Sequence, residues 1–227
     1  MSNLAWYQSS LDRFSAESGR IRQRLILADV DSLKSDARKL NEIGEVKAFV
    51  YVWLAAALER GMRDLLQLLV AQINLTSTPA VALVPGLLGL AVANDLEALR
   101  MLRDYQKTWP KKHEMFSTVL STNPVTLDTS VIPLDGRTLR PYHFDVIWTV
   151  FGFSGPSMPS PLHRISLTDL AEGRNDIAHG DQDPAKFGRK KQVPDLSRLV
   201  DRIEDSFLYF ISTADEYLKM AKFKTTP

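Results

Sequence analysis

The chain has 227 residues and a mass of 25.6 kDa, and 44% of its residues are hydrophobic, so it can bury a substantial core and whole-chain disorder is excluded. Lys and Arg number 28 against 27 Asp and Glu, so the net charge of +1 supplies no overall field for a polyanion or a membrane surface. Any contact with nucleic acid must therefore be made by a local site.

Cysteine is missing from the sequence, which excludes disulfides, zinc sites with thiolate ligands, cysteine nucleophiles and thiol redox switches. The polar start MSNLAWYQSSLDRF lacks the basic-then-apolar order of a signal peptide. The longest apolar run, residues 78–93, is shorter than the roughly 18 to 20 residues of a membrane span and is interrupted by Pro85, Gly86 and Gly89. We expect a protein of the reducing cytoplasm without a membrane partner.

Amphipathic and apolar helices are predicted for the first half of the chain. Residues 3–28 carry apolar side chains at steps of three and four, which predicts one long or kinked amphipathic helix, and a short helix is expected over 31–40. Residues 45–73 contain no Pro, a single Gly and a nearly continuous apolar surface, which predicts a buried helix of about eight turns at the core of the fold. Residues 78–93 are expected to form a buried turn between helices.

The second half alternates helices with irregular segments. A helix over 93–108 is expected to end before Trp109 and Pro110, because a proline disfavours helical geometry in the residue that precedes it. β-Branched residues around the Asp135-Gly136 turn signal predict a loop with a small hairpin within 117–140. The remaining helices are expected at 142–151, ending at Gly152, at 166–179 and at 195–222, with a connector rich in Pro and Ser at 154–161.

The order of these elements predicts the fold class. Strands do not alternate with helices, so a doubly wound nucleotide-binding fold is not expected. We predict an all-α helical bundle that forms one domain over residues 1–227, with a loop-rich insertion at about 109–141.

The four histidines limit the chemistry that the chain can carry. They are His113, His143, His163 and His179, and the sequence has no HExxH, GxSxG, GxxxxGK[ST] or GxGxxG motif, so zincin, hydrolase, P-loop and Rossmann signatures are absent. His113 lies in a charged connector and is interpreted as a surface residue. His143 and His163 begin predicted helices, where orienting a backbone group is as plausible a role as chemistry. Neither a metal nor a cofactor is expected.

The helix predicted over 166–179 ends in an unusual group of polar residues. Arg174 falls on an apolar stripe, where a guanidinium must be paired, face an interface or meet an anion, because an unpaired charge in low dielectric costs several kcal/mol. Asn175 and His179 are four residues apart on the adjacent face, so these three side chains can line one rim of a groove. The alternative is that His179 and Gly180 merely close the helix, with His179 at the negative end of the helix dipole. The stripe consists of Leu167, Leu170, Ala171, Ile177 and Ala178.

The segment RNDIAHG, residues 174–180, resembles the RNxxxH form of the R-x(4-6)-H motif of the HEPN superfamily, all-α domains named for higher eukaryote and prokaryote nucleotide binding. A second match, from Arg137 to His143, contains Pro141 and cannot lie on one helix. The long apolar helix with AAALERGMRDLL, the insertion, the short helix before Gly152 and the final amphipathic helix resemble the arrangement of RiboL-PSP-HEPN and related HEPN nucleases.

The resemblance implies a HEPN-like helical bundle and a metal-independent endoribonuclease, of the kind found in toxin and antiphage defence systems. Its substrate would be RNA, cleaved by transesterification through the 2′-hydroxyl: His179 would act as base or acid, Arg174 would stabilise the phosphorane, and Asn175 would position phosphate or sugar, or orient His179. Because one His cannot be base and acid at once, and because the family builds its sites at dimer interfaces, a homodimer is expected, with a cognate antitoxin or other defence protein as a further partner.

One departure from the family pattern and one alternative function remain open. The subgroup that works with a nucleotidyltransferase antitoxin has a Tyr two places after the His, whereas this chain has Asp181 there. This puts regulation by tyrosine modification in doubt. The alternative to a nuclease is a catalytically inactive HEPN-like module that binds a nucleotide or a protein in a defence or regulatory complex.

Two further sets of charged residues are candidates for the site. Glu59 falls on the apolar stripe of the 45–73 helix, and it either pairs with Arg174 and holds the guanidinium toward the groove or forms an exposed pair with Arg63. The basic residues just beyond the motif either bind RNA phosphates or form a solvated loop. They are Lys186, Arg189, Lys190 and Lys191.

Overall fold

The computed structural model describes residues 5–32 and 36–225, and within these ranges the chain is built from helices joined by loops. The predicted all-α class is confirmed. In the described ranges strand pairing is limited to two isolated bridges, Pro79 with Pro124 and Leu83 with Lys224. The small hairpin predicted within 117–140 is therefore wrong, because the β-branched residues there find no partner strand and follow an irregular path over the helices.

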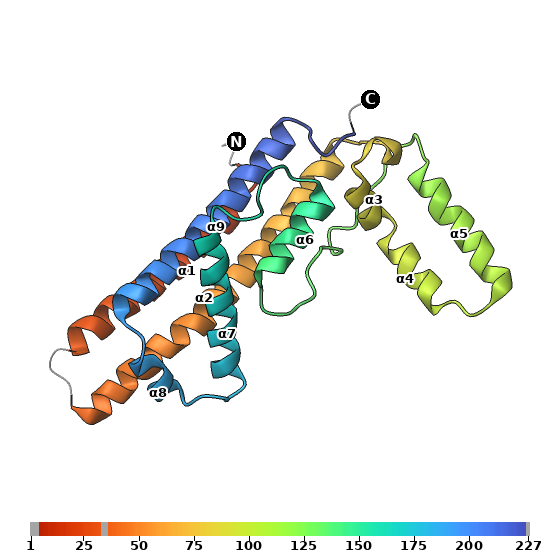
Figure 1. Ribbon diagram of the computed structural model, residues 1–227. Coiled ribbons are helices and arrows are strands. Elements are labelled where there is room, and N and C mark those ends of the chain that lie inside the picture. The colour runs from red at the N-terminus through yellow and green to blue at the C-terminus, as the bar shows by residue number, and fades with distance from the viewer. Residues whose placement is uncertain (1–4, 33–35, 226–227) are drawn as a thin grey trace.

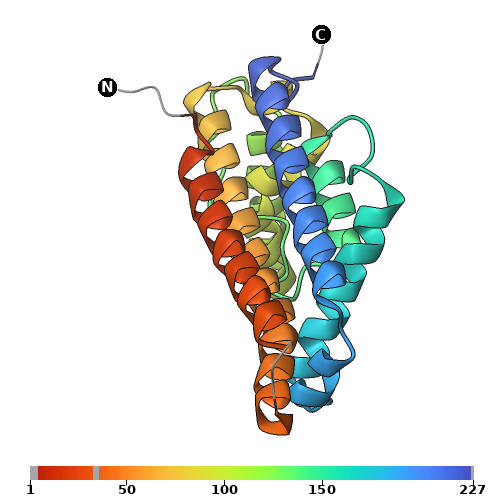
Figure 2. The same ribbon diagram turned by 90° about the vertical axis from the view of Figure 1, so that its left-hand side faces the viewer.

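Three long helices form the bundle: α1 (Gln8–Ser32), α2 (Ala37–Leu75) and α9 (Val193–Lys219). Figures 1 and 2 show them side by side along its length, with the start of α1 and the end of α9 at the same end. Helix α2 is the central element, because it contacts α1, α9 and two shorter helices, α7 (Pro161–Ala178) and α8 (Pro184–Arg189). No helix in the described ranges is both long and apolar enough to cross a bilayer.

The start of α2 differs from the prediction. The helix begins eight residues earlier than expected, where the Asp36 side chain accepts a hydrogen bond from the Lys39 backbone N–H at 2.9 Å and so caps the first turn. The separate short helix predicted over 31–40 is wrong, because α1 extends to Ser32 and α2 starts at Ala37, on either side of residues 33–35, which lie outside the described ranges. The cap formed by Asp36 thus lets α2 begin here, although its first turns are polar.

The core of the bundle lies between α1, α2 and α9. The rings of Phe14 and Phe207 stack at 4.1 Å between centroids, against Gly61 of α2. A Cβ at Gly61 would lie 2.8 Å from the Phe207 ring, so this glycine allows the helices to approach closely. The deepest aliphatic side chains of α2 include Leu54, Leu58, Met62, Leu65, Leu66, Leu69 and Val70.

Helix α6 (Pro141–Phe151) packs beside α3 (Pro85–Ala91) at the side of the bundle. Its predicted end is confirmed: Gly152 has φ +67° and ψ +34°, a left-handed geometry that glycine adopts without a Cβ clash. The expected turn over 78–93 contains a 3-10 turn, Ala80–Ala82, and α3. A Cβ at Gly86 would meet the Val150 carbonyl oxygen at 2.0 Å, so this contact fixes how α6 lies on α3.

Helices α4 (Ala93–Met101) and α5 (Tyr105–Val119) form an arm that projects from the bundle, as Figure 1 shows. The single helix predicted over 93–108 is wrong, because the helix is interrupted at residues 102–104. Asp104 caps a new helix there by accepting a hydrogen bond from the Gln106 backbone N–H at 2.9 Å. Pro110 then lies inside α5 instead of ending a helix. The irregular part of the insertion therefore starts near residue 120, not at 109. Of the described residues of α4 and α5, Met115 alone is buried.

Candidate functional site

Helix α7 carries the residues of the RNDIAHG segment and ends as predicted. His179 is its C-cap, with its backbone N–H donating to the Asn175 carbonyl at 2.9 Å, and Gly180 follows in a left-handed conformation with φ +74°. The helix starts at Pro161, five residues before the predicted start. Proline suits the first helical position, because the backbone N–H that it lacks would have no partner there. The backbone of His179 closes the helix while its side chain stays exposed.

The apolar stripe of α7 packs against α2 through a glycine. Leu167, Leu170, Ala171 and Ile177 are buried as expected, whereas Ala178 is exposed at the end of the helix. Gly173 lies directly against the buried ring of Tyr51, whose hydroxyl donates to Asp169 Oδ2 at 3.0 Å. This close contact places the next residue, Arg174, half-buried at the border between the stripe and the solvent.

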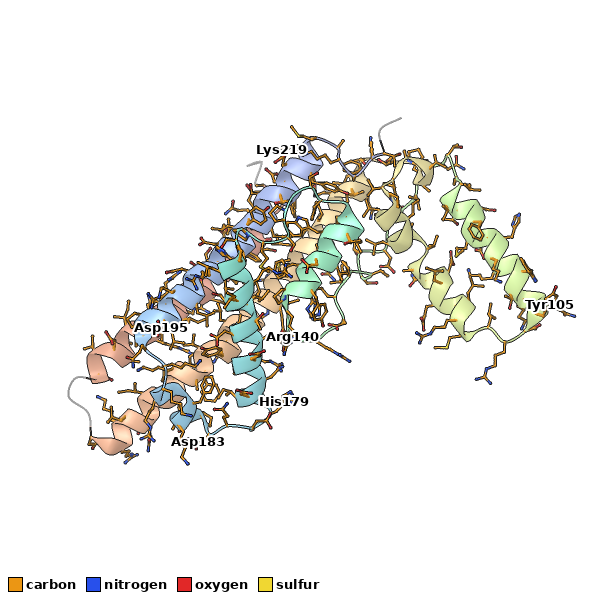
Figure 3. The ribbon with its side chains drawn as sticks, in the orientation of Figure 1. Tyr105, Arg140, His179, Asp183, Asp195 and Lys219 are labelled. Carbon is orange, nitrogen blue, oxygen red and sulfur yellow. The ribbon has the colours of Figure 1, made fainter. Side chains whose placement is uncertain are left out.

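A pocket of about 440 Å³ opens at the end of α7. Arg174, Asn175 and His179 line it together, which agrees with the expected common rim. The opposite wall is formed by the loop that precedes α6 and by the first turn of α6. Figure 3 shows two of the lining residues, Arg140 and His179, on these neighbouring elements. The complete lining is Gly136, Arg137, Thr138, Arg140, Tyr142, Arg174, Asn175 and His179.

The loop before α6 is held by His143, which is buried. The Arg140 backbone N–H donates to His143 Nδ1 at 2.9 Å, so Nε2 is the protonated nitrogen of the neutral ring and donates to Asp135 Oδ1 at 2.9 Å. Asp135 Oδ1 also accepts from the Arg137 backbone N–H at 3.0 Å. Both interactions lower the pKa of Asp135, the Arg137 amide more than His143. His143 therefore orients backbone, and both of its ring nitrogens are occupied away from the pocket.

The second R-x(4-6)-H match thus contributes to the same pocket in a different way from the first. Arg137 to His143 does not form one helix, as Pro141 predicts, since α6 begins at Pro141. The two arginines of this segment, Arg137 and Arg140, nevertheless line the pocket. Sequence reasoning missed them, and the only signal for them was this second motif match.

The pocket is rich in positive charge. Among its described lining residues three are arginines and none is acidic. Arg174 Nη1 donates to Asn175 Oδ1 at 3.2 Å, and Thr138 Oγ1 donates to the same oxygen at 3.3 Å, so Asn175 connects the two walls. Within the described ranges Arg174 has no ion-pair partner within 4.0 Å. Its guanidinium is therefore available to an anion such as a phosphate.

Glu59 lies near Arg174 but does not line the pocket. Its side chain is half-buried, its Oε1 is buried without a hydrogen-bond partner, and in the described ranges neither Arg174 nor Arg63 approaches it within ion-pair distance. Burial raises the pKa of Glu59, and the charges of Arg174 and then Arg63, together with the Leu139 backbone N–H, only partly oppose this shift. Neither of the two direct pairs considered from the sequence forms, although Arg174 is the stronger electrostatic neighbour.

The basic residues beyond the motif lie outside the pocket. The segment for which a solvated loop was the alternative to RNA binding forms the short helix α8, where Gly188 contacts the backbone of Gly44 in α2 so closely that a Cβ would meet the Gly44 carbonyl oxygen at 1.8 Å. Lys186, Arg189 and Lys190 are exposed. Lys191 lies over the rings of Tyr51 and Phe187, at 5.0 and 4.9 Å, and 3.6 Å from Asp169. Lys191 therefore stabilises the packing of α8.

The two remaining histidines do not line the pocket. His113 is exposed on α5, as expected for a surface residue, and His163 Nδ1 lies 2.8 Å from Ser160 Oγ at the start of α7. Across the described part of the chain, no three His, Asp or Glu side chains gather in a way that could hold a metal ion. Comparisons with family models, with curated proteins and with solved structures give no match.

Proposed function

We propose that this chain is a metal-independent endoribonuclease of the HEPN type, which cleaves RNA in the pocket at the end of α7. One observation carries the proposal: Arg174, Asn175 and His179 open into a single pocket that contains three arginines and no acidic lining residue among those described. Such a pocket suits a phosphodiester, whose negative charge the guanidiniums would balance.

The residues present can supply the steps of a transesterification. A base removes the proton of a 2′-hydroxyl, the 2′-oxygen attacks the adjacent phosphorus, and the bond to the 5′-oxygen breaks as an acid donates a proton to it. The products are a 2′,3′-cyclic phosphate and a 5′-hydroxyl. The exposed imidazole of His179 can act as base or acid, while the planar fork of Arg174 binds the non-bridging oxygens. Asn175, which accepts a hydrogen bond from Arg174, orients the guanidinium.

A second copy of the chain completes this chemistry. Each chain contributes one His179 to the pocket, and one imidazole cannot accept and donate a proton in the same step. A two-fold dimer that brings two exposed ends of α7 together supplies both groups. We propose a homodimer with a composite site, acting in the cytoplasm as a toxin or antiphage effector under the control of an antitoxin or another defence protein.

The proposal is tested by incubating the purified chain with single-stranded RNA or transfer RNA in EDTA. We expect cleavage with 2′,3′-cyclic phosphate ends, and we expect His179→Ala and Arg174→Ala each to abolish it while the far-ultraviolet circular dichroism stays unchanged. His113→Ala, at an exposed histidine on α5, is the matched control and should leave cleavage intact. Strict dependence on a divalent ion, or full activity of His179→Ala, would contradict the mechanism; RNA binding without cleavage would favour the inactive module.

A further inference from the structure

The pocket contains a second group of residues that the proposed cleavage step does not use. Arg137, Arg140 and Tyr142 come from the loop before α6 and its first turn, opposite Arg174 and His179. Their charge is only weakly compensated, since Arg137 Nε is 3.8 Å from Asp135 and Arg140 Nη1 is 4.0 Å from Glu172, with the Asp135 side chain nearly half exposed and the Glu172 side chain largely exposed to solvent. Exposed pairs at such distances contribute little, so both guanidiniums can accept a stronger anion.

The backbone that carries these arginines is fixed from two sides. On one side His143 holds Asp135 and the Arg140 amide. On the other side buried Thr138 donates to Asn175 of α7, at 3.3 Å. Because the loop is held by these contacts and not by the guanidiniums, Arg137 and Arg140 extend from an ordered support, which reduces the entropy lost when they bind a ligand.

Tyr142 adds a flat surface to this wall. The centroid of its ring lies 3.9 Å from that of the His143 ring, with an angle of 30° between the planes, and the residue is 46% exposed. The phenol ring therefore lies against a buried imidazole, and Tyr142 is one of the residues that line the pocket. Supported aromatic rings of this kind bind nucleobases by stacking, whatever the base.

We propose that Arg137, Arg140 and Tyr142 form a subsite for the nucleotide that flanks the scissile bond in single-stranded RNA. The two guanidiniums bind the neighbouring phosphate and Tyr142 stacks on the neighbouring base, while Arg174 holds the phosphate that is cut. This inference rests on the proposed function for the identity of the ligand, and it makes the substrate a strand with consecutive phosphates instead of a single nucleotide.

Binding of a fluorescently labelled oligonucleotide with 2′-O-methyl groups throughout tests the subsite without requiring cleavage. The affinity of the full-length chain is measured by anisotropy at several salt concentrations. For Arg137→Gln with Arg140→Gln we expect at least a tenfold loss of affinity and a decrease of about 0.7 in the slope of log affinity against log salt, because the two guanidiniums bind one phosphate and each phosphate contact to a single strand contributes about 0.7. Tyr142→Leu should weaken binding by about 5- to 100-fold without changing that slope.

The control is Arg38→Gln with Arg198→Gln, which removes two exposed arginines outside the pocket. Substitution by lysine at 137 and 140 is a second check, and it should restore most of the salt slope while leaving affinity reduced, since the ammonium keeps the charge and loses the bidentate fork. An unchanged slope in the glutamine double variant, or no binding by the wild type, overturns the subsite. Cleavage by the wild type with an unchanged slope refutes the subsite alone, whereas a reduced slope without cleavage refutes the nuclease alone.

Discussion

Replacing Gly173 with alanine tests how α7 is positioned on α2, and hence how the pocket is built. The added Cβ would lie 2.3, 2.6 and 2.9 Å from three atoms of the Tyr51 ring, which is more than 1 Å closer than ordinary contact for the nearest of them. Tyr51 is 1% exposed, and its hydroxyl donates a hydrogen bond to Asp169 at 3.0 Å, so the ring has little room to rotate away. The alanine must therefore push α7 away from α2.

The size of the effect follows from comparison with a second glycine. Gly19 lies inside α1, and a Cβ added there would meet no heavy atom within 4 Å, so Gly19→Ala should stabilise the protein by about 1 kcal/mol through helix propensity. Gly173→Ala gains the same propensity but overpacks the contact with Tyr51, which costs about 1–3 kcal/mol. Because the propensity term is common to both, Gly173→Ala should be about 1–3 kcal/mol less stable than Gly19→Ala.

Urea unfolding followed by circular dichroism measures this difference directly. Cleavage should also decrease in Gly173→Ala, since the substitution displaces the neighbouring Arg174 from the wall that carries Thr138. Gly19→Ala should cleave like the wild type. Equal unfolding free energies for the two alanine variants would refute the close packing of α7 on Tyr51 and the placement of the pocket derived from it.

Three further substitutions give expected outcomes. Because burial raises the pKa of Glu59, the free energy of unfolding decreases as pH rises through that raised pKa. Glu59→Gln should remove this decrease, and the variant should be no less stable than the wild type at pH 8. A loss of about 3 kcal/mol at pH 8 would instead indicate a direct pair with Arg174. Arg164 lowers the pKa of Asp145 to about 2, so the pair stabilises the fold above about pH 4 and its contribution disappears toward pH 2. Arg164→Gln should therefore reduce the decrease in unfolding free energy over this acid range. The reduction should be under about 1 kcal/mol, since both side chains are about half exposed. Mixed dimers of wild-type and His179→Ala chains should be nearly inactive, because the proposed mechanism uses one copy of His179 as base and the other as acid, and half activity would contradict the composite site.

The predictable part of the fold is the part governed by local sequence. The long apolar helix, the ends of α6 and α7 at Gly152 and Gly180, and the amphipathic α9 were predicted because periodicity and left-handed glycines act over a few residues. The break between α4 and α5 was missed, because the Asp104 cap competes with a periodic pattern that continues through it. Helix α8 was missed because the contact between Gly188 and Gly44 joins positions remote in the chain.

The candidate site, like the fold, has residues that local sequence predicts and residues that it does not. Arg174, Asn175 and His179 share a pocket because they share the last turns of one helix, which their spacing predicts. Arg137 and Arg140 were not predicted, because the loop that carries them is positioned by the buried contacts of His143 and Thr138. The spacing of apolar residues revealed that Glu59 was unusual but did not decide its partner. That depends on how closely α7 approaches α2, which the Gly173 contact sets.

The most direct test of the account uses one RNA that the wild-type chain cuts at a mapped position. Only the 2′-hydroxyl at that position is replaced by a methoxy group, and the products formed in EDTA are measured by mass spectrometry. If Arg174 and His179 catalyse attack by the 2′-oxygen, the modified RNA should stay intact there, while the unmodified RNA gives a 2′,3′-cyclic phosphate and a 5′-hydroxyl end. Continued cleavage at the methoxy position, or a product with a 5′-phosphate, would contradict the account.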